Sequence, residues 1–525
     1  MVVPELRPWR AARPHVVRIA GAVRPRLARA AATVRPGLAR LRGDGKPQVA
    51  RPKTWGYTAG AATAGLALAA GVVTAAGPWD SSGQRTAEQD RAVALSRPGG
   101  TDHGSAAGAP GRPRPAPSAG PVLTGLGGVS TVRSGPDGKA LADALTPLLK
   151  DPALGPRPAA AVVDVTTGRR LFGKSPDAAS TPASTTKIAT AVAALSAMGP
   201  DHRLTTRAAL EPDTKEVVLV GGGDPTLTAR EKAAGQASLR DLAAGTAAAL
   251  ADRGIREVTL SYDTTLYAGS DRHPIGENDN LARVTPLMAD EGRTDDSTSG
   301  PAARVPDPAA DAARRFGDFL KGHGIKAGAP GLSKATTRAK TLATVSSPPL
   351  SALVERMLTQ SDNDLAEALA RQTAIATGHP ADFAGADKAV GARLRALGLP
   401  VKGAAFKDGS GLDRADRLTP GLLTALLAKA ADPSHPELRP ALTGLPVAGF
   451  TGTLTSRYTD GAAGVVRAKT GTLHGVNALA GTLVDEQGRL LAFAFMTTGT
   501  EGVAPTATQK ALDRVASALA ACGCG

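Results

Sequence analysis

Three short motifs in this chain carry side chains that could act as a nucleophile, a base and an anion-binding group. The first is Ser184 followed three positions later by Lys187, within the stretch TPASTTKIAT. Thr181 and Pro182 are typical of a helix start and would place Ser184 in the first helical turn. Residues three apart share a helix face, so the Lys187 ammonium would reach the Ser184 hydroxyl. The positive field at a helix N-terminus would also favour an oxyanion formed there. The alternative interpretation is an ordinary helix start with a solvated lysine.

The second motif is Ser361-Asp362-Asn363, which interrupts an apolar helical pattern over 350–358. A new helix is expected directly after it. A serine and an asparagine at such a junction can point into a cleft, where the hydroxyl relays a proton and the amide holds a substrate carbonyl. The alternative is a capping box in which Ser361 pairs with Asp364, three residues further on.

The third motif is Lys469-Thr470-Gly471-Thr472, on a stretch that is expected to form a strand. Gly471 would remove a side chain where a ligand lies against the strand. Lys469 would supply a fixed positive charge, and the two threonines would supply hydroxyls for a carboxylate. The alternative is a plain strand with a glycine bulge. Ser410, in DGSGLDR, is a rival nucleophile, but no lysine or histidine follows it at helical spacing, so we expect a structural role near the cleft.

Each of the three patterns occurs once in the chain, in this order. The set resembles that of class A β-lactamases and penicillin-binding proteins. However, 177 positions separate Ser184 from Ser361, far more than a β-lactamase-like core needs, so a region must be inserted there. The chain therefore resembles the D-alanyl-D-alanine carboxypeptidase/endopeptidase family of low-molecular-mass penicillin-binding proteins, the S13 serine peptidases, which carry extra β-rich domains at this point. Further matches are GGGDPTLT (221–228), DGSGLDRADRLTP (408–420) and VRAKTGTL (466–473).

The resemblance implies a serine acyl-enzyme mechanism that needs no cofactor and no metal ion. It assigns the site to eight residues: Ser184, Lys187, Ser361, Asn363, Lys469, Thr470, Gly471 and Thr472. Ser184 would be the acylated nucleophile. Lys187 would be its base, made neutral or proton-sharing by burial beside Lys469.

The remaining roles concern the substrate. Ser361 would pass a proton to the leaving amine, and Asn363 would hold the substrate amide. Lys469 and the two threonines of the third motif would bind the terminal carboxylate. The oxyanion hole would be formed by the backbone N–H groups of Ser184 and Thr472.

The implied substrates are peptidoglycan stem peptides that end in D-Ala-D-Ala, with β-lactam antibiotics as covalent inhibitors. The implied reaction removes the terminal D-alanine or cuts D-alanyl cross-links. The general-base glutamate motif of class A β-lactamases is not recognisable, so fast deacylation of penicillin is not expected. Two other interpretations stay open: a serine esterase or β-lactamase on the same core, and a catalytically slow module that binds the cell wall or senses penicillin.

The fold expected from these patterns is α+β. Helical leucine spacing over 138–150, a strand-turn-strand pattern over 159–173, three strand-like runs over 464–499 and an amphipathic helix over 504–521 indicate an antiparallel sheet flanked by helices. Both chain ends contribute to this sheet. With the resemblance, the prediction is a penicillin-binding/β-lactamase-like core with one or more β-rich domains inserted between the first and second motifs.

The net charge of +15 is concentrated at the N-terminus, because residues 1–53 hold 13 Lys/Arg and two acidic residues. The remainder is only mildly basic, so no nucleic-acid partner is indicated. The 26 uncharged residues 54–79 would form a helix of about 39 Å, long enough to span a hydrocarbon core of about 30 Å. The positive-inside rule then keeps 1–53 in the cytoplasm and exports the rest. A cleaved signal, cut near 73–77, would export it too.

The predicted catalytic region therefore lies outside the cytoplasm, anchored in the cell membrane by one N-terminal transmembrane helix, or secreted if the signal is cleaved. Two cysteines near the C-terminus and eight scattered histidines give no disulfide framework and no metal-binding pattern. The predicted divisions are a basic cytoplasmic tail (1–53), a transmembrane signal anchor (54–79), a Pro/Gly/Ser-rich stalk (80–120), a first catalytic segment (121–203), the inserted region (204–345) and a second catalytic segment (346–525).

Overall fold

The computed structural model describes residues 138–458 and 461–522. The tail, transmembrane anchor and stalk expected over 1–120 lie outside the described residues and stay predictions. Within the two described ranges, no helix combines the length and the apolar character that a bilayer span requires.

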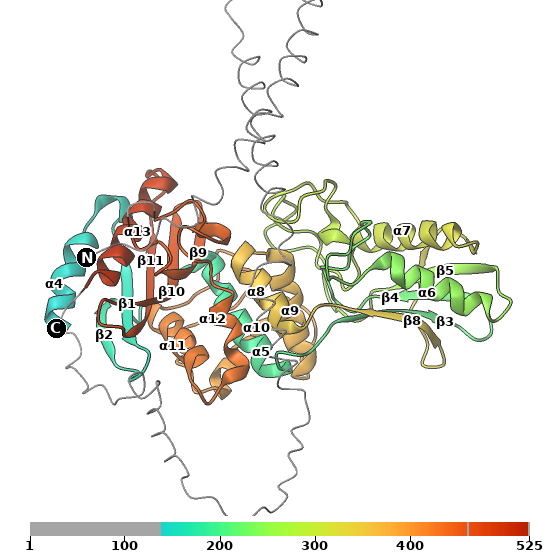
Figure 1. Ribbon diagram of the computed structural model, residues 1–525, viewed down its shortest axis with the longest axis horizontal. Helices are drawn as coiled ribbons and strands as arrows, with labels where there is room; N and C mark the ends of the chain where they lie inside the picture. Colours follow the sequence, from blue (N-terminus) through green and yellow to red (C-terminus); the bar gives the residue numbers. More distant parts are fainter. Residues whose placement is uncertain (1–137, 459–460, 523–525) are drawn as a thin grey trace, which may run out of the picture. The chain divides into compact units, whose positions relative to one another are not determined.

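A five-stranded antiparallel sheet joins the two ends of the described chain, with the strand order β2-β1-β11-β10-β9 (Figure 1). Its strands are β1 (Ala159–Asp164), β2 (Arg170–Lys174), β9 (Arg467–Leu473), β10 (Val476–Val484) and β11 (Leu490–Thr498). β1 pairs with β11, so that Val162 lies opposite Phe493. The turn between β10 and β11 is closed by a hydrogen bond from the Gly488 N–H to the Asp485 carbonyl. The predicted antiparallel sheet, built from both chain ends, is confirmed.

The two faces of this sheet carry side chains of different size, because alternate residues of a strand point to opposite sides. On β11, Ala492 and Ala494 belong to one buried cluster, whereas Phe493 and Phe495 belong to the other. The small side chains allow helices to pack close to the first face, and the phenylalanines fill the space beneath the second.

Helices cover both faces. The layer on the first face contains α5 (Thr186–Met198), α8 (Leu350–Gln360), α9 (Asn363–Ala376), α10 (Phe383–Ala396), α11 (Pro420–Ala431) and α12 (Pro440–Thr443). The second face is covered by α4 (Gly138–Leu148) and α13 (Pro505–Ala520), which confirms the two helices expected at the ends of the core. Short 3-10 turns are η3 (Pro152–Leu154), η4 (Ala183–Thr185), η6 (Pro436–Leu438) and η7 (Gly452–Leu454).

Between α5 and α8 the chain forms a second sheet with its own hydrophobic core. Its strands are β3 (Thr205–Leu210), β4 (Glu216–Val220), β5 (Glu257–Asp263), β6 (Lys326–Ala327), β7 (Gly331–Leu332) and β8 (Lys340–Ser346), in the order β6-β5-β4-β3-β8 with β7 beside β5. β4 and β5 pair in parallel, so a crossover is needed, and α6 (Leu239–Ala251) supplies it.

The inserted region, expected to be β-rich, contains a second helix beside its strands. Helix α7 (Pro308–Gly322), capped by Asp307 and begun by a proline, packs on α6 and on the sheet (Figure 1). Its buried side chains recur at helical spacing, whereas arginines and aspartates fill its outer face. Before it, residues 264–307, all of which the structure describes, form a long loop with no helix or strand apart from η5 (Asp290–Gly292). We call this segment the 264–307 loop.

Candidate active site

Ser184 lies in the 3-10 turn η4, and helix α5 begins directly after it at Thr186. The α-helix therefore starts later than the sequence indicated. Thr181 does not cap it, because the Thr181 hydroxyl donates to the Arg414 carbonyl. Ala183 has a φ of 48°, in the left-handed region that residues with a side chain seldom adopt. This sharp turn, residues 182–185, is called the serine turn below; it leaves Ser184 half-buried in front of a buried helix.

Two glycines allow neighbouring segments to approach the serine turn. A Cβ on Gly471 of β9 would lie 2.6 Å from the Pro182 carbonyl oxygen. A Cβ on Gly411, whose φ is 82°, would lie 2.0 Å from the Ala183 carbonyl oxygen. The space beside Gly471 is therefore filled by the serine turn, where the sequence pattern had suggested a ligand.

Lys187 is fully buried on α5, and its Nζ lies close to three oxygen atoms. The distances are 3.0 Å to Ser184 Oγ, 2.6 Å to Asn363 Oδ1 and 2.7 Å to the Ser410 carbonyl. Three oxygens complete the shell of an ammonium, which has three N–H donors. Burial lowers the pKa of Lys187 to about 8, although nearby carboxylates oppose the shift. The neutral amine is thus accessible near neutral pH.

The neutral form of Lys187 has two N–H donors and one lone pair. The Ser410 carbonyl can only accept. The Asn363 side chain also presents its oxygen to the lysine, because its Nδ2 donates to the Asn280 carbonyl at 2.9 Å. These two acceptors take both N–H groups, so the Ser184 hydroxyl is the one partner of the three that can donate to the lone pair. The arrangement can therefore remove a proton from Ser184.

Ser361 ends helix α8 with φ 58° and ψ 39°, a left-handed conformation, and Asn363 begins α9. The predicted capping box of Ser361 with Asp364 is wrong. An N-cap residue has extended backbone, and this is found at Asp362, whose carboxylate accepts from the Leu365 N–H at 3.0 Å. The Ser361 hydroxyl is left to face strand β9.

Lys469 lies fully buried on β9, and its Nζ donates to Ser361 Oγ and to the Thr470 carbonyl, both at 2.9 Å. Burial, and then the charge of Lys187, lower the pKa of Lys469 well below its usual range. The Thr470 hydroxyl donates to Thr453 at 3.0 Å. The structure thus joins the second and third motifs through one hydrogen bond and the first and second through another.

The three motifs meet at a cavity of about 210 Å³. Its motif residues are Ser184, Ser361, Asn363 and Thr472, and Thr472 is exposed. The 264–307 loop closes another side with residues that no sequence motif indicated: Asn280, Arg293, Ser299, Gly300 and Pro301. Because an irregular loop brings them there from a separate sheet, no periodic pattern could have indicated them. The inserted region therefore contributes to the wall of the site.

Three buried carboxylates near Lys187 were also missed: Glu367, Asp408 and Asp416. Burial, and then the charge of Asp408, raise the pKa of Glu367 to about 7 and that of Asp416 to about 9. A signal for Glu367 existed, since it lies four residues after Asn363 and so on the same face of a helix. The two aspartates belong to the DGSGLDRADRLTP stretch.

Within the described ranges, two buried groups have the side chains of a metal site: His273, Glu367 and Asp408; and Glu291, Asp362 and Asp364. Their oxygens already accept hydrogen bonds. In the first group, Glu367 accepts from the Ser410 N–H at 2.8 Å. In the second, Arg304 contacts Asp364 at 2.9 Å and Arg356 contacts Glu291. Since these donors satisfy the carboxylates, we assign neither group as a metal centre.

A family model described as the D-Ala-D-Ala carboxypeptidase 3 (S13) family matches residues 141–299 and 292–519. A carboxypeptidase of Mycobacterium tuberculosis is 35% identical over 431 residues, which cover 78% of this chain and 90% of the relative. The carboxypeptidase DacB of Mycolicibacterium smegmatis is 36% identical over 428 residues, with the same coverage of 78% and 90%. A D-alanyl-D-alanine carboxypeptidase of Actinomadura sp. is 31% identical over 448 residues, covering 70% of this chain and 82% of that protein.

Among solved structures, penicillin binding protein 4 (dacB) from Haemophilus influenzae covers 70% of this chain and 97% of its own, with a TM-score of 0.59 and 22% identity. A structure of that protein complexed with a β-lactam has a TM-score of 0.55 and 23% identity, covering 71% of this chain and 97% of its own. These likenesses confirm the predicted α+β penicillin-binding fold.

Proposed function

Since the chain belongs to the D-Ala-D-Ala carboxypeptidase 3 (S13) family, we propose that it is a serine-type D-alanyl-D-alanine carboxypeptidase that also cuts D-alanyl cross-links. Its substrates are peptidoglycan stem peptides that end in D-Ala-D-Ala. The mechanism passes through an acyl-enzyme, and β-lactams inhibit it covalently. No cofactor takes part in the steps below.

The observation that carries this proposal is the hydrogen-bond shell of Lys187. Two of its three partners can only accept, so the neutral amine is held with its lone pair toward the Ser184 hydroxyl, 3.0 Å away. A lysine whose pKa is lowered to about 8 is a suitable base near neutral pH. This pairing of a buried base with a half-buried hydroxyl at a cavity is what nucleophilic catalysis requires.

In the first half-reaction, Ser184 Oγ attacks the carbonyl carbon of the penultimate D-alanine, and its proton passes to Lys187 Nζ. The C–N bond to the terminal D-alanine then breaks. The proton held by Lys187 is relayed to the leaving amine through the Ser361 hydroxyl, which already accepts a hydrogen bond from Lys469, so Lys187 is neutral again. In the second half-reaction, water attacks the ester carbonyl carbon and its proton passes to Lys187. The ester C–O bond breaks, Lys187 returns the proton to Ser184 Oγ, and the shortened peptide leaves. Asn363, which lines the cavity, orients the Lys187 amine in both half-reactions and holds the substrate amide.

The terminal carboxylate of the substrate is bound by the third motif. The substrate carboxylate favours the ammonium form of Lys469 behind the strand, and the exposed Thr472 hydroxyl lines the cavity. The backbone N–H groups of Ser184 and Thr472 bind the oxyanion. Support for this role comes from the packing of β9 directly against the serine turn.

We further propose that the catalytic region works outside the cytoplasm, because peptidoglycan lies there. Residues 54–79 anchor it in the cell membrane with a single span, and 1–53 stay inside. If the signal is cleaved near 73–77, the catalytic region is secreted instead.

The test is covalent labelling with penicillin. A stable adduct is expected on the peptide that contains Ser184, located by mass spectrometry, and Ser184→Ala should abolish both the adduct and D-alanine release from stem peptides. Ser410→Ala tests the rival nucleophile. Because Ser410 is fully buried, penicillin should not label it, and Ser410→Ala should keep the adduct on Ser184. Labelling of Ser410 would overturn the assignment. Rapid turnover of penicillin would favour the β-lactamase alternative.

A further inference from the structure

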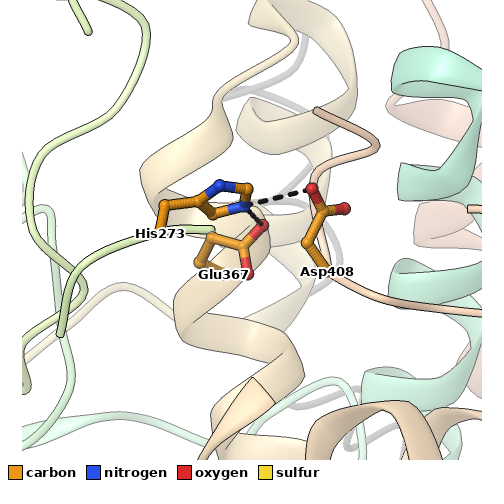
Figure 2. A group of neighbouring side chains, drawn as sticks. All are labelled: His273, Glu367 and Asp408. Carbon is orange, nitrogen blue, oxygen red and sulfur yellow. Dashed lines mark hydrogen bonds and ion pairs between the residues drawn. The ribbon is translucent and has the colours of Figure 1, made fainter. Parts of the chain in front are cut away.

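His273, in the 264–307 loop, is buried beneath the catalytic residues, 4% exposed. Its Nε2 lies 3.1 Å from Asp408 Oδ2 and 3.8 Å from Glu367 Oε1, and Figure 2 shows both carboxylates approaching this one ring nitrogen. Its Nδ1 is 3.3 Å from the Ile275 N–H and accepts from it. The proton of the neutral ring is therefore on Nε2, where it is donated to Asp408. The ring edge also contacts Phe383 of α10, at 5.3 Å between centroids.

The two carboxylates hold the backbone of the DGSG stretch, residues 408–411. Glu367 Oε1 accepts from the Ser410 N–H at 2.8 Å and from the Gly409 N–H at 3.1 Å. Asp408 accepts from the Gly411 and Asp413 N–H groups at 2.5 and 2.6 Å. The peptide held in this way is the one whose Ser410 carbonyl accepts from Lys187 at 2.7 Å.

We propose that His273 is a positioning residue for Lys187: it fixes Asp408 and Glu367, which hold the Ser410 carbonyl against the lysine. The inserted region thereby helps to set the base of the reaction. This inference rests on the proposed function, in which Lys187 accepts the Ser184 proton. Asn280 of the same loop performs a parallel task, because its carbonyl fixes the Asn363 amide that also contacts Lys187.

His273 also balances charge. Burial lowers its pKa, but the hydrogen bond to Asp408 and the charges of the two carboxylates outweigh burial, so the net pKa is raised. The ionisable groups that face His273 are Glu367, Asp408 and Asp413. Phe383 contacts the His273 ring, and the Arg371 guanidinium carbon lies 4.3 Å from the centroid of the Phe383 ring. The ionisable groups that face Lys187 are Asp362, Glu367, Asp408, Asp416 and Lys469. Removal of His273 takes from the two carboxylates the Nε2–H donor and, below the raised pKa of the ring, a positive charge, which stabilises the Lys187 ammonium and raises its pKa.

The experiment compares acylation rates of the full-length protein by labelled penicillin between pH 6 and pH 10. His273→Ala should slow acylation at pH 7 by about 10- to 100-fold, the range for a displaced catalytic group. In the profile of acylation rate against pH, the pH of half-maximal rate should rise by about half a unit to one unit. His273→Gln, whose amide can still donate to Asp408, should recover most of the rate. His379→Ala is the control, since His379 contacts Thr377 outside the site. An unchanged pH of half-maximal rate in His273→Ala, or no recovery of the acylation rate in His273→Gln, would overturn the proposal.

A second measurement separates this inference from the proposed function. In protein labelled with ¹³Cε-lysine, the Lys187 signal is assigned by its loss in Lys187→Met, and its titration is followed without any substrate. His273→Ala should move that titration to higher pH, whereas His379→Ala should not. If penicillin fails to acylate Ser184, the proposed function fails, yet this titration still supports or contradicts the link between His273 and Lys187.

Discussion

The Lys469 amino group donates to the Ser361 hydroxyl at 2.9 Å, and this contact connects strand β9 to the turn between α8 and α9. A second buried lysine, Lys187, contacts the Ser184 hydroxyl, and its charge contributes to the lowered pKa of Lys469. Two ammonium ions at such a site repel each other, so the site favours one neutral lysine. Burial lowers the pKa of both lysines, and the hydrogen bonds of Lys187 direct its lone pair toward the Ser184 hydroxyl.

Replacement of Lys187 by methionine keeps much of its volume but removes the base. Lys187→Met should slow acylation of Ser184 by about 10²- to 10⁴-fold, the usual contribution of general-base catalysis. The rate is followed by fluorescence of penicillin-labelled protein on gels. Lys174→Met is the matched control, because Lys174 is half-buried at the end of β2 and donates to the Leu149 carbonyl, away from the cavity. A wild-type rate in Lys187→Met would remove the lysine from the mechanism.

The rate of acylation should rise with pH through about 8. Burial lowers the pKa of Lys187 from 10.5 to about 8, and only the neutral amine accepts the Ser184 proton. Below that pH the neutral fraction falls by about tenfold per unit, so acylation at pH 6 should be about 100-fold slower than on the plateau. Stopped-flow fluorescence with a reporter β-lactam measures the profile. A flat profile between pH 6 and pH 9 would contradict a titrating base.

Much of the site could be predicted because its residues lie in short local motifs. Ser184 and Lys187 are three residues apart near a helix start. Lys469 lies in a short stretch whose sequence is typical of a strand. The detail of the caps could not be predicted. Whether Ser361 or Asp362 caps α9 depends on the left-handed backbone at Ser361, which no local sequence pattern indicates.

The contribution of the inserted region could not be predicted. Asn280 and His273 lie in an irregular loop and reach residues more than 80 and 130 positions away along the chain, Asn363 and Asp408. Such contacts depend on how the loop folds back onto the core, and hydrophobic periodicity carries no information about that. The sequence predicted the length and the β-rich character of the insertion, but not which of its residues reach the site.

Recognition of the substrate carboxylate should depend on the third motif. Thr472→Val removes a hydroxyl that lines the cavity and should raise the barrier for peptides with a free D-alanine carboxylate by about 2 to 4 kcal/mol. Lys469→Ala should do the same. D-alanine release is compared with release of the corresponding methyl ester by chromatography. An equal loss for both substrates would show that these side chains do not bind the carboxylate.

The proposed membrane topology predicts on which side of the membrane a fused reporter protein lies. A reporter joined after Gly120 should be extracytoplasmic and should stay in the membrane fraction if 54–79 span the bilayer. Alkaline phosphatase activity reports export, and carbonate extraction reports anchoring. A mature N-terminus near Ala76 would instead establish a cleaved signal and a secreted enzyme.

Gly471 should be intolerant even of alanine. A Cβ at this position would lie 2.6 Å from the Pro182 carbonyl oxygen, which is backbone and cannot swing away. Gly471→Ala must therefore push the serine turn from strand β9, displacing Ser184 relative to Lys187 and to the oxyanion donors. We expect destabilisation by about 1 to 3 kcal/mol, the usual cost of overpacking, together with a loss of acylation larger than the unfolded fraction explains. Gly328→Ala is the control, since a Cβ there would meet no atom within 4 Å and its backbone is not left-handed. Urea unfolding and penicillin labelling are measured on the same samples, and wild-type labelling of a folded Gly471→Ala would show that the turn and the strand are not held together by this contact.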